Sequence, residues 1–400
     1  MTVSVQSAYH KLFDYITGHG FKGYDPYDGN HTRLGLLKKY YPARVLLTYL
    51  NKFSPVNLRP LLGISRSESN QTLAFLMRAI LTHKPNTTQA DEFIQKTLDH
   101  FLVNSLQDIY GEHAWYGLGY PVQMLKPRTP FDHTIPDVIA TESCALAILQ
   151  YAQQEENHEP LKEYITGAAR YFMKHHLVES DVHTFFKYYP DSPVHQVTYN
   201  ASVIAAAYLL EVGLIEKKPI WTETAKKAID FVIGNQHPEG YWNYRIDLET
   251  AAEKQQIDFH QGFILDALLR FIQLDGNNPV AEESYKKGLE FYHQKQFLPT
   301  GQSIYRYPRK WPVNIHNQAQ GIITFTRAAE AGFGDEYHHF ARTIAQWTIQ
   351  NMQDKDGHFY FLKYPLFTNK IPYIRWSDAA MAYALAVLLE YEKKLQHQNA

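Results

Sequence analysis

The feature that most constrains this fold is an internal repeat with a period near 60 residues. Successive copies start 58, 60, 57 and 60 residues apart, at Glu142, Asn200, His260, Asn317 and Ser377. Each copy is rich in Ala, Leu and Ile and has the spacing of a helix. A more charged helical stretch follows each of the first four, as in 221–236 and 281–297. The repeat therefore predicts pairs of helices, an apolar inner one and a charged outer one.

A third element recurs after each charged helix. It is a loop rich in Tyr, Phe and Trp with strand-like alternation, found at 113–121, 183–190, 239–247, 303–308 and 357–365. The less regular N-terminal part contains further helical stretches near 34–51 and 70–82. These stretches would supply the remaining helices of the array.

Such helix pairs cannot bury their apolar faces alone and must stack on their neighbours. The stack is either an open solenoid or a closed ring. Six hairpins of about 60 residues fill a chain of 400 residues. The inner stretches are rich in Ala, which lets crowded helices approach closely. We therefore expect an all-α fold, an (α/α)6 toroid of helical hairpins with the aromatic loops at its funnel end, in a single domain over residues 1–400.

The composition excludes several classes of protein. The formal net charge is -2 without long runs of one sign, which argues against a general nucleic-acid binder. Cys144 is the single cysteine, so no internal disulfide or cysteine-rich zinc site is expected. The N-terminus has no signal-peptide pattern, and no apolar run reaches the roughly 18 residues of a membrane span. These features predict a cytoplasmic protein without a transmembrane segment, and they leave its oligomeric state open.

Aromatic residues are unusually frequent, with 29 Tyr, 22 Phe and 6 Trp. Most of them must pack in the core, because aromatic side chains carry large apolar surfaces. An excess of tyrosine also suits a polar groove that stacks on sugar rings. We therefore expect an oligosaccharide, a polysaccharide or a sugar-linked precursor as the partner.

Polar side chains gather where the inner helices start. Asp258 and His260 stand at the mouth of an otherwise ordinary amphipathic helix, without a Ser or Thr cap. In a toroid these helix starts surround one funnel, and their free N–H groups favour an anionic or hydroxyl-rich ligand. The candidate catalytic residues are Tyr199, Asp258, His260 and His316. The candidate substrate-binding residues are Glu142, Asn200, Trp242, Tyr244, Asn317, Gln318, Arg375, Trp376 and Asp378.

Several of these residues also have a structural interpretation, such as a hydrogen-bonded core histidine for His260 and a packing role for Trp376. Asp258, Asn200, Asn317 and Asp378 can be helix caps, and Arg375 can pair with Asp378. Caps alone do not explain why His, Tyr, Trp and Arg recur at equivalent places. No metal or cofactor is expected, and no lysine is expected in the funnel.

Several stretches resemble a group of poorly characterised bacterial proteins associated with polysaccharide biosynthesis. They are YDPYDG at 24–29, SPVNLRPLLGI at 54–64, YNAS at 199–202, IDFHQGFILDAL at 257–268 and NIHNQAQGI at 314–322, together with 352–385. The group is similar in fold to six-hairpin glycosidases, glucuronyl C5-epimerases and toroidal polysaccharide lyases. The resemblance implies a carbohydrate-active protein of bacterial surface-polysaccharide metabolism.

Three kinds of chemistry compete for the funnel. A lyase or C5-epimerase acting on a uronate-containing glycan needs a base, an acid and a group that neutralises the carboxylate. His260 as base, with Asn200 or Arg375 holding the carboxylate, fits this class best. A glycoside hydrolase needs a carboxyl pair, which Asp258 would form with Glu142 or Asp378. The third alternative is a non-catalytic glycan-binding protein. Terpene cyclase and prenyltransferase toroids are a weaker comparison, since no DDxxD-like motif is present.

Overall fold

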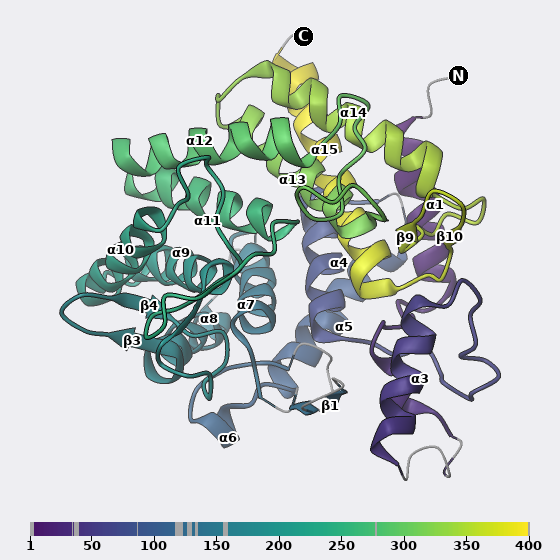
Figure 1. Cartoon of the computed structure of the whole chain (residues 1–400), viewed down its shortest axis with the longest axis horizontal. Helices are drawn as coiled ribbons and strands as arrows, with labels where there is room; N and C mark the ends of the chain where they lie inside the picture. Colours follow the sequence, from purple (N-terminus) through teal and green to yellow (C-terminus); the bar gives the residue numbers. More distant parts are fainter. Residues whose placement is uncertain are drawn as a thin grey trace.

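The structure is a computed structural model that describes residues 4–33, 35, 40–85, 87–116, 123–125, 130–132, 135–154, 159–276 and 278–398. An inner ring runs through α4 (Asn70–Thr82), α7 (Val138–Ala152), α9 (Tyr199–Ile215), α11 (His260–Asp275), α13 (Ile315–Glu330) and α15 (Ala379–Gln398). Each of these helices packs against the next, and α15 packs back against α4. The ring is therefore closed, and Figure 1 shows α15 beside α4.

An outer helix covers each inner one. The outer layer consists of α1 (Val5–Gly18), α5 (Gln89–Val103), α8 (Glu159–Tyr171), α10 (Pro219–Gly234), α12 (Pro279–Gln296) and α14 (Asp335–Met352). The N-terminal helix α1 packs against α14 and α15, so the start of the chain completes the last hairpin (Figure 1). The expected (α/α)6 toroid is confirmed, and an open solenoid is excluded.

The remaining elements lie outside the two layers of helices. They are α3 (Tyr41–Phe53), α6 (Gln107–Tyr110), the 3-10 turn η1 (Asp28–His31) and the π-helical turns η2 (Phe172–His176) and η3 (Ile374–Asp378). Antiparallel ribbons form from β1 (Gln123–Leu125) with β2 (Pro130–Asp132), and from β3 (Leu177–Glu179) with β4 (Thr184–Phe186). One three-stranded sheet contains β5 (Gln196–Thr198), β6 (Arg245–Asp247) and β7 (Glu253–Lys254). A second three-stranded sheet contains β8 (Val313–Asn314), β9 (Leu362–Lys363) and β10 (Thr368–Asn369). Most of these strands belong to the aromatic loops or to the segments that lead into inner helices.

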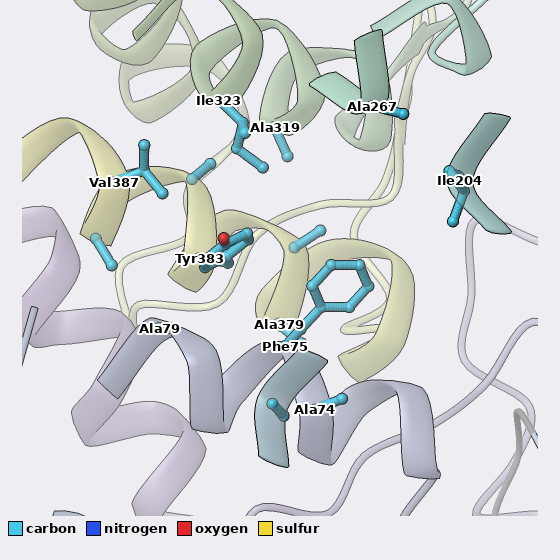
Figure 2. Packing of buried hydrophobic residues seen from close by; sticks show 14 of the residues in the cluster. Ala74, Phe75, Ala79, Ile204, Ala267, Ala319, Ile323, Ala379, Tyr383 and Val387 are labelled. Atoms are coloured by element: carbon cyan, nitrogen blue, oxygen red, sulfur yellow. The ribbon is translucent and has the colours of Figure 1, made fainter. Parts of the chain in front are cut away.

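The inner helices are apolar around most of their circumference because they are covered on every side. In α9, residues 199–210 are all buried. Figure 2 shows Ala74 and Ala79 of α4 near Ala379 of α15, where small side chains let the two helices approach closely. Burial on every side thus explains why the inner helices are more apolar in sequence than the outer ones.

A belt of polar side chains lines the inside of the ring. The Tyr383 hydroxyl accepts hydrogen bonds from Arg78 Nη2 at 2.7 Å and from Arg327 Nη2 at 2.6 Å. Arg327 also donates to Asp266 at 2.8 Å. The belt continues through Arg270 of α11, which pairs with Glu211 of α9 and lies 3.6 Å from Glu142 of α7. Every inner helix contributes to this belt, which lines a cavity of about 370 Å³.

The expected inner-helix starts agree closely with the structure for α9, α11 and α13. The first expected start is wrong by four residues, because α7 begins at Val138 and not at Glu142. The helix expected near 34–51 is observed as α3, and residues 34 and 36–39 lie outside the described part of the chain. Within the described residues, no helix combines the length and apolar character that crossing a bilayer requires. The assignment of residues 1–400 to a single domain stays a prediction.

The contact between α11 and α13 provides a test of ring packing at Gly262. A Cβ atom on Gly262 would lie 2.5 Å from Gln320 Cγ and 2.9 Å from Thr324 Oγ1. We expect Gly262→Ala to lower the free energy of unfolding by about 1–3 kcal/mol, because it overpacks a closed contact. The matched control is Gly234→Ala at the end of α10, where a Cβ meets no atom within 4 Å. Urea unfolding of both variants measures the difference, and equal stability of the two would contradict the close packing.

Candidate active site at the inner-helix starts

The starts of the inner helices surround a cavity of about 880 Å³. Seven of the thirteen residues that the sequence analysis selected line this cavity: Asn200, Tyr244, Asp258, His260, His316, Arg375 and Trp376. The other six, Glu142, Tyr199, Trp242, Asn317, Gln318 and Asp378, are not part of its lining. The cavity is thus built from helices, loops and the N-terminal segment together.

Asp258 and His260 form the most direct polar contact in the cavity. Asp258 Oδ1 lies 2.5 Å from His260 Nδ1 and also accepts the backbone N–H of His260 at 3.3 Å. Burial acts to raise the pKa of Asp258, but the nearby His260 and Arg306 outweigh it and hold that pKa below its ordinary value. Asp258 therefore stays ionised and favours the tautomer with hydrogen on Nδ1. This tautomer leaves His260 Nε2 able to accept a proton.

His316 is the second imidazole of the cavity. Burial lowers the pKa of His316 to about 4, so its ring is neutral near pH 7. Its Nδ1 lies 3.4 Å from the carbonyl oxygen of Trp376. The ring of Phe259 lies 4.3 Å from that of His260 and 4.5 Å from that of His316, measured between centroids. The two imidazoles thus share one wall, with Phe259 between them.

Tyr244 provides a phenol beside His260. Their ring centroids are 4.8 Å apart in an edge-to-face arrangement. Burial, followed by the charge of Asp258, raises the pKa of Tyr244 to about 12. The phenol is therefore protonated at neutral pH and can act as a proton donor. A carboxylate, an imidazole and a phenol stand next to one another.

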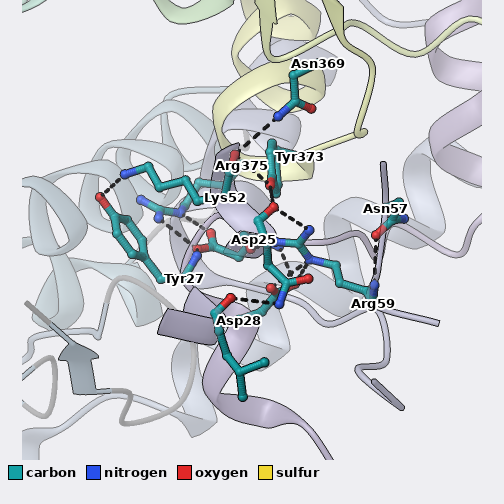
Figure 3. A network of polar contacts seen from close by, with 11 residues as sticks. Asp25, Tyr27, Asp28, Lys52, Asn57, Arg59, Asn369, Tyr373 and Arg375 are labelled. Atoms are coloured by element: carbon teal, nitrogen blue, oxygen red, sulfur yellow. Dashed lines mark hydrogen bonds and ion pairs between the residues drawn. The ribbon is translucent and has the colours of Figure 1, made fainter. Parts of the chain in front are cut away.

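Arg375 and Trp376 come from the π-helical turn η3. Arg375 makes two hydrogen bonds to Asp25, at 2.7 and 3.2 Å, and a third to Gln71 at 3.2 Å. The alternative pairing of Arg375 with Asp378 is therefore wrong. Figure 3 shows Arg375 beside Asp25, where the N-terminal segment meets η3. The N-terminal segment thus forms part of the cavity wall.

Some of the polar residues at helix starts hold the aromatic loops. At five inner-helix starts, a side-chain oxygen accepts a backbone N–H of the preceding loop. The pairs are Thr141 with Trp115 (3.4 Å), Ser202 with Phe186 (3.2 Å), Gln261 with Trp242 (2.9 Å), Gln318 with Ser303 (2.6 Å) and Asp378 with Phe359 (2.8 Å). We call these five acceptors the loop anchors. Gln318 and Asp378, which were expected to bind substrate, each hold a backbone N–H of an aromatic loop.

The remaining expected residues also have structural contacts. Asn317 accepts the N–H of Phe259 and donates to the carbonyl oxygens of Ile304 and Tyr305. Trp242 is fully buried and donates its indole N–H to Val232. Tyr199 is fully buried as well. Glu142 belongs to the polar belt and faces the smaller cavity. None of these four side chains lines the larger cavity.

Asn200 differs from these, because it lines the cavity and its Oδ1 has no hydrogen-bond partner among the described residues. A buried polar atom without a partner is costly, but this Oδ1 is covered from the cavity and is not itself a ligand contact.

Asp137 and Lys52 are among the lining residues that sequence reasoning missed. Asp137 caps α7 by accepting the N–H of Ala140 at 2.8 Å, and burial raises its pKa to about 6. A Pro-Asp pair before an apolar run is a helix-start signal that could have located it. Lys52 of α3 lines the cavity too, which corrects the expectation that the funnel holds no lysine. Its position depends on long-range contacts that the repeat does not encode.

The architecture is shared with enzymes of known structure. These include a GH76 α-mannanase of Bacteroides thetaiotaomicron (TM-score 0.62, 10% identity, 84% of this chain and 90% of that chain) and a cellobiose 2-epimerase of Bacillus thermoamylovorans (0.59, 10%, 82% and 90%). A heparin-specific unsaturated glucuronyl hydrolase has a TM-score of 0.60 at 12% identity and covers 98% of both chains. These similarities establish the fold.

No protein-family model matches the chain. A lanosterol synthase of Candida albicans is 26% identical over 204 residues, which is 49% of this chain and 26% of that protein. The chain therefore spans about a quarter of that relative. From the structural similarities we conclude that the chain has the six-hairpin glycosidase-like (α/α)6 toroid fold.

The buried His316 makes stability depend on pH. Its pKa of about 4 lies below the ordinary 6.5, so the unfolded chain binds a proton at a pH where the folded protein does not. The stabilising contribution of neutral His316 is present above pH 6.5 and is lost as the pH falls toward 4. Between pH 7 and 4.5 the wild type should lose roughly 2–3 kcal/mol of its free energy of unfolding through His316, and His316→Gln should lack this loss.

Urea unfolding of the wild type and the variant at the two pH values measures this difference. His10→Gln on the exposed face of α1 is the control and should keep the wild-type dependence. The same pH dependence in wild type and His316→Gln would show that His316 is not buried as a neutral ring.

Proposed function

We propose that this protein is a carbohydrate-active enzyme that removes a carbon-bound proton from a uronate-containing glycan, as a lyase or a C5-epimerase. The observation that carries the proposal is the Asp258–His260 contact of 2.5 Å beside the protonated phenol of Tyr244. The bacterial surface-polysaccharide context rests on the sequence resemblance alone.

His260 is the proposed base. The C5 proton of a uronate lies next to a carboxylate, and its removal requires a base of suitable pKa and a site that stabilises the resulting charge. Asp258 holds Nδ1 and stabilises the imidazolium that forms when Nε2 takes up the proton. The C5–H electron pair then moves toward the carboxylate as an enolate.

Tyr244 is the proposed acid. In a lyase, the enolate expels the oxygen at C4, and the phenol of Tyr244 protonates that leaving group. In an epimerase, a proton returns to C5 from the opposite face of the sugar. His316 is neutral and lies on the same wall as His260, so it is not assigned this proton transfer.

A hydrolase is the second candidate, on the basis of Asp137. The pKa of Asp137 is raised to about 6, whereas that of Asp258 is lowered, and both residues line the cavity. Two carboxyl groups with opposite shifts are the arrangement that glycosidases use for an acid and a base or nucleophile. Asp137 replaces Glu142 and Asp378 as the partner of Asp258, because those two do not line the cavity.

Two other functions have less support. A terpene cyclase would bind a hydrocarbon chain, which a cavity with eight charged side chains among its described lining residues disfavours. A non-catalytic glycan-binding protein would need the aromatic and polar wall but not the Asp258–His260 contact. Binding without turnover would favour this last alternative.

The experiment for the main proposal is proton exchange in deuterated water. Incubation with uronate-containing polysaccharides is expected to give deuterium uptake at C5, or an unsaturated product that absorbs in the ultraviolet. His260→Gln should reduce either signal by about 100-fold or more, because a general base typically contributes about 10²–10⁴-fold. His339→Gln on the outer helix α14 is the control and should retain full activity. Uptake or elimination that persists in His260→Gln would remove this residue from the mechanism.

The hydrolase candidate predicts a different response to substitution at Asp137. If glycoside hydrolysis is the reaction, new reducing ends appear without deuterium at C5, and Asp137→Asn lowers their rate by about 100-fold or more. Asn keeps an oxygen that can cap α7, so the variant should retain its fold, which circular dichroism checks. A proton-abstracting enzyme would instead keep much of its exchange activity in Asp137→Asn. The two reactions are thereby distinguished with one variant.

A further inference from the structure

The segment before α4 lies outside the 60-residue repeat, yet it completes the cavity. Lys52, in the last turn of α3, lines the cavity together with Tyr27. The Lys52 ammonium donates to the Tyr27 hydroxyl at 2.9 Å. It also lies 4.3 Å from the centre of the Tyr27 ring and 4.8 Å from that of Trp376. An ammonium group on the cavity wall is thus held by two aromatic faces, as Figure 3 shows in part.

Buried contacts fix the position of this segment. Arg59 and Asp28 form an ion pair at 2.7 Å, and both side chains are almost fully buried. The Tyr373 hydroxyl donates to the carbonyl oxygen of Asn51 at 2.8 Å, and Asn369 donates to that of Lys52 at 3.2 Å. Figure 3 shows how these contacts join the end of α3 to the loop that leads into η3. The backbone of Lys52 is therefore anchored to the ring.

The charges along the wall favour an anion. Among the described residues that line the cavity, five carry positive charge and three carry carboxyl groups. The basic residues are Lys52, Arg245, Lys254, Arg306 and Arg375, and the acidic ones are Asp137, Asp191 and Asp258. Arg375 is bonded to Asp25, and Arg306 lies 3.3 Å from Asp258. The Lys52 ammonium stands on the same basic wall, held against the rings of Tyr27 and Trp376.

The pKa of Lys52 agrees with this interpretation. Burial lowers it to about 8; Tyr305 and Asp25 act to raise it, while Arg375 and Arg306 act to lower it further. The two guanidinium groups therefore repel the ammonium. A bound anion would offset that repulsion and keep Lys52 protonated to higher pH.

We infer that Lys52 recognises the anionic group of the sugar, a carboxylate or a phosphate, and so selects charged over neutral sugars. This inference rests on the proposed function because it concerns the same cavity. It adds a specificity residue from a segment that the repeat does not include. Lys52 positions the ligand and takes no part in proton transfer.

Calorimetric titration tests the inference with three probes: D-glucuronate, D-glucose 6-phosphate and D-glucose. We expect Lys52→Met to bind an anionic sugar about 10- to 100-fold more weakly, because it loses a charged hydrogen bond. Binding of glucose should not change. Lys52→Arg keeps the charge and should retain most of the affinity. Lys286→Met, on the outer helix α12 with its side chain 60% exposed, is the control and should bind as the wild type does.

The pH dependence gives a second readout. Wild-type affinity for an anionic sugar should fall as the pH rises from 7 through 8 to 9, since Lys52 then loses its proton. Lys52→Arg should lack this decline, because a guanidinium stays protonated. Unchanged anion affinity in Lys52→Met, or an equal loss for glucose, would overturn the inference.

The two proposals fail separately. Proton exchange that occurs without any role of Lys52 in binding would leave the proposed reaction intact and remove the anion site. Lys52-dependent anion binding without turnover would support the anion site and contradict the proposed reaction. Binding of D-glucuronate rather than D-glucose 6-phosphate identifies the anionic group as a carboxylate, and the opposite preference identifies it as a phosphate.

Discussion

The contact of α15 with α4 closes the ring, and the rest of the structure depends on it. Tyr383 of α15 accepts hydrogen bonds from Arg78 of α4 and Arg327 of α13, which ties three inner helices together at one hydroxyl. Arg327 continues the belt to Asp266. Arg327 and Asp266 are half-buried, and removing either one would leave the other charge inside the ring without its counterion. Only in a closed ring do all six inner helices direct their starts to one cavity.

The first turns of the inner helices combine two tasks. Residues that line the cavity are Ile139, Asn200, His260, His316 and Trp376, and the loop anchors are Thr141, Ser202, Gln261, Gln318 and Asp378. At four of these five starts the anchor follows the lining residue by two positions. Two positions are about 200° around an α-helix, so one side chain faces the ring axis and the other faces away. This geometry explains why polar residues cluster there without all of them meeting a ligand.

The repeat made much of the architecture predictable. A period near 60 residues gave the inner helices, and α11 begins at His260 as expected. Seven lining residues could be selected because helix starts converge in a toroid. Sequence alone could not separate lining residues from loop anchors, since that depends on which loop folds over each helix. Asp137 was missed because the start of α7 was expected four residues later. Lys52 was missed because it reaches the cavity through contacts such as Tyr373 with Asn51, which are 322 residues apart.

The division between anchors and lining residues also bears on how one fold supports different reactions. The solved toroids named above share only 10–12% identity with this chain, yet include an epimerase and hydrolases. A loop anchor contributes to loop position whatever the ligand is, so its polar group is constrained by the fold. A lining residue such as His260 or Asn200 faces the cavity and is constrained by the ligand instead. The chemistry of such a protein must therefore be inferred from the lining residues and from segments outside the repeat, because the ring and its anchors are compatible with several reactions.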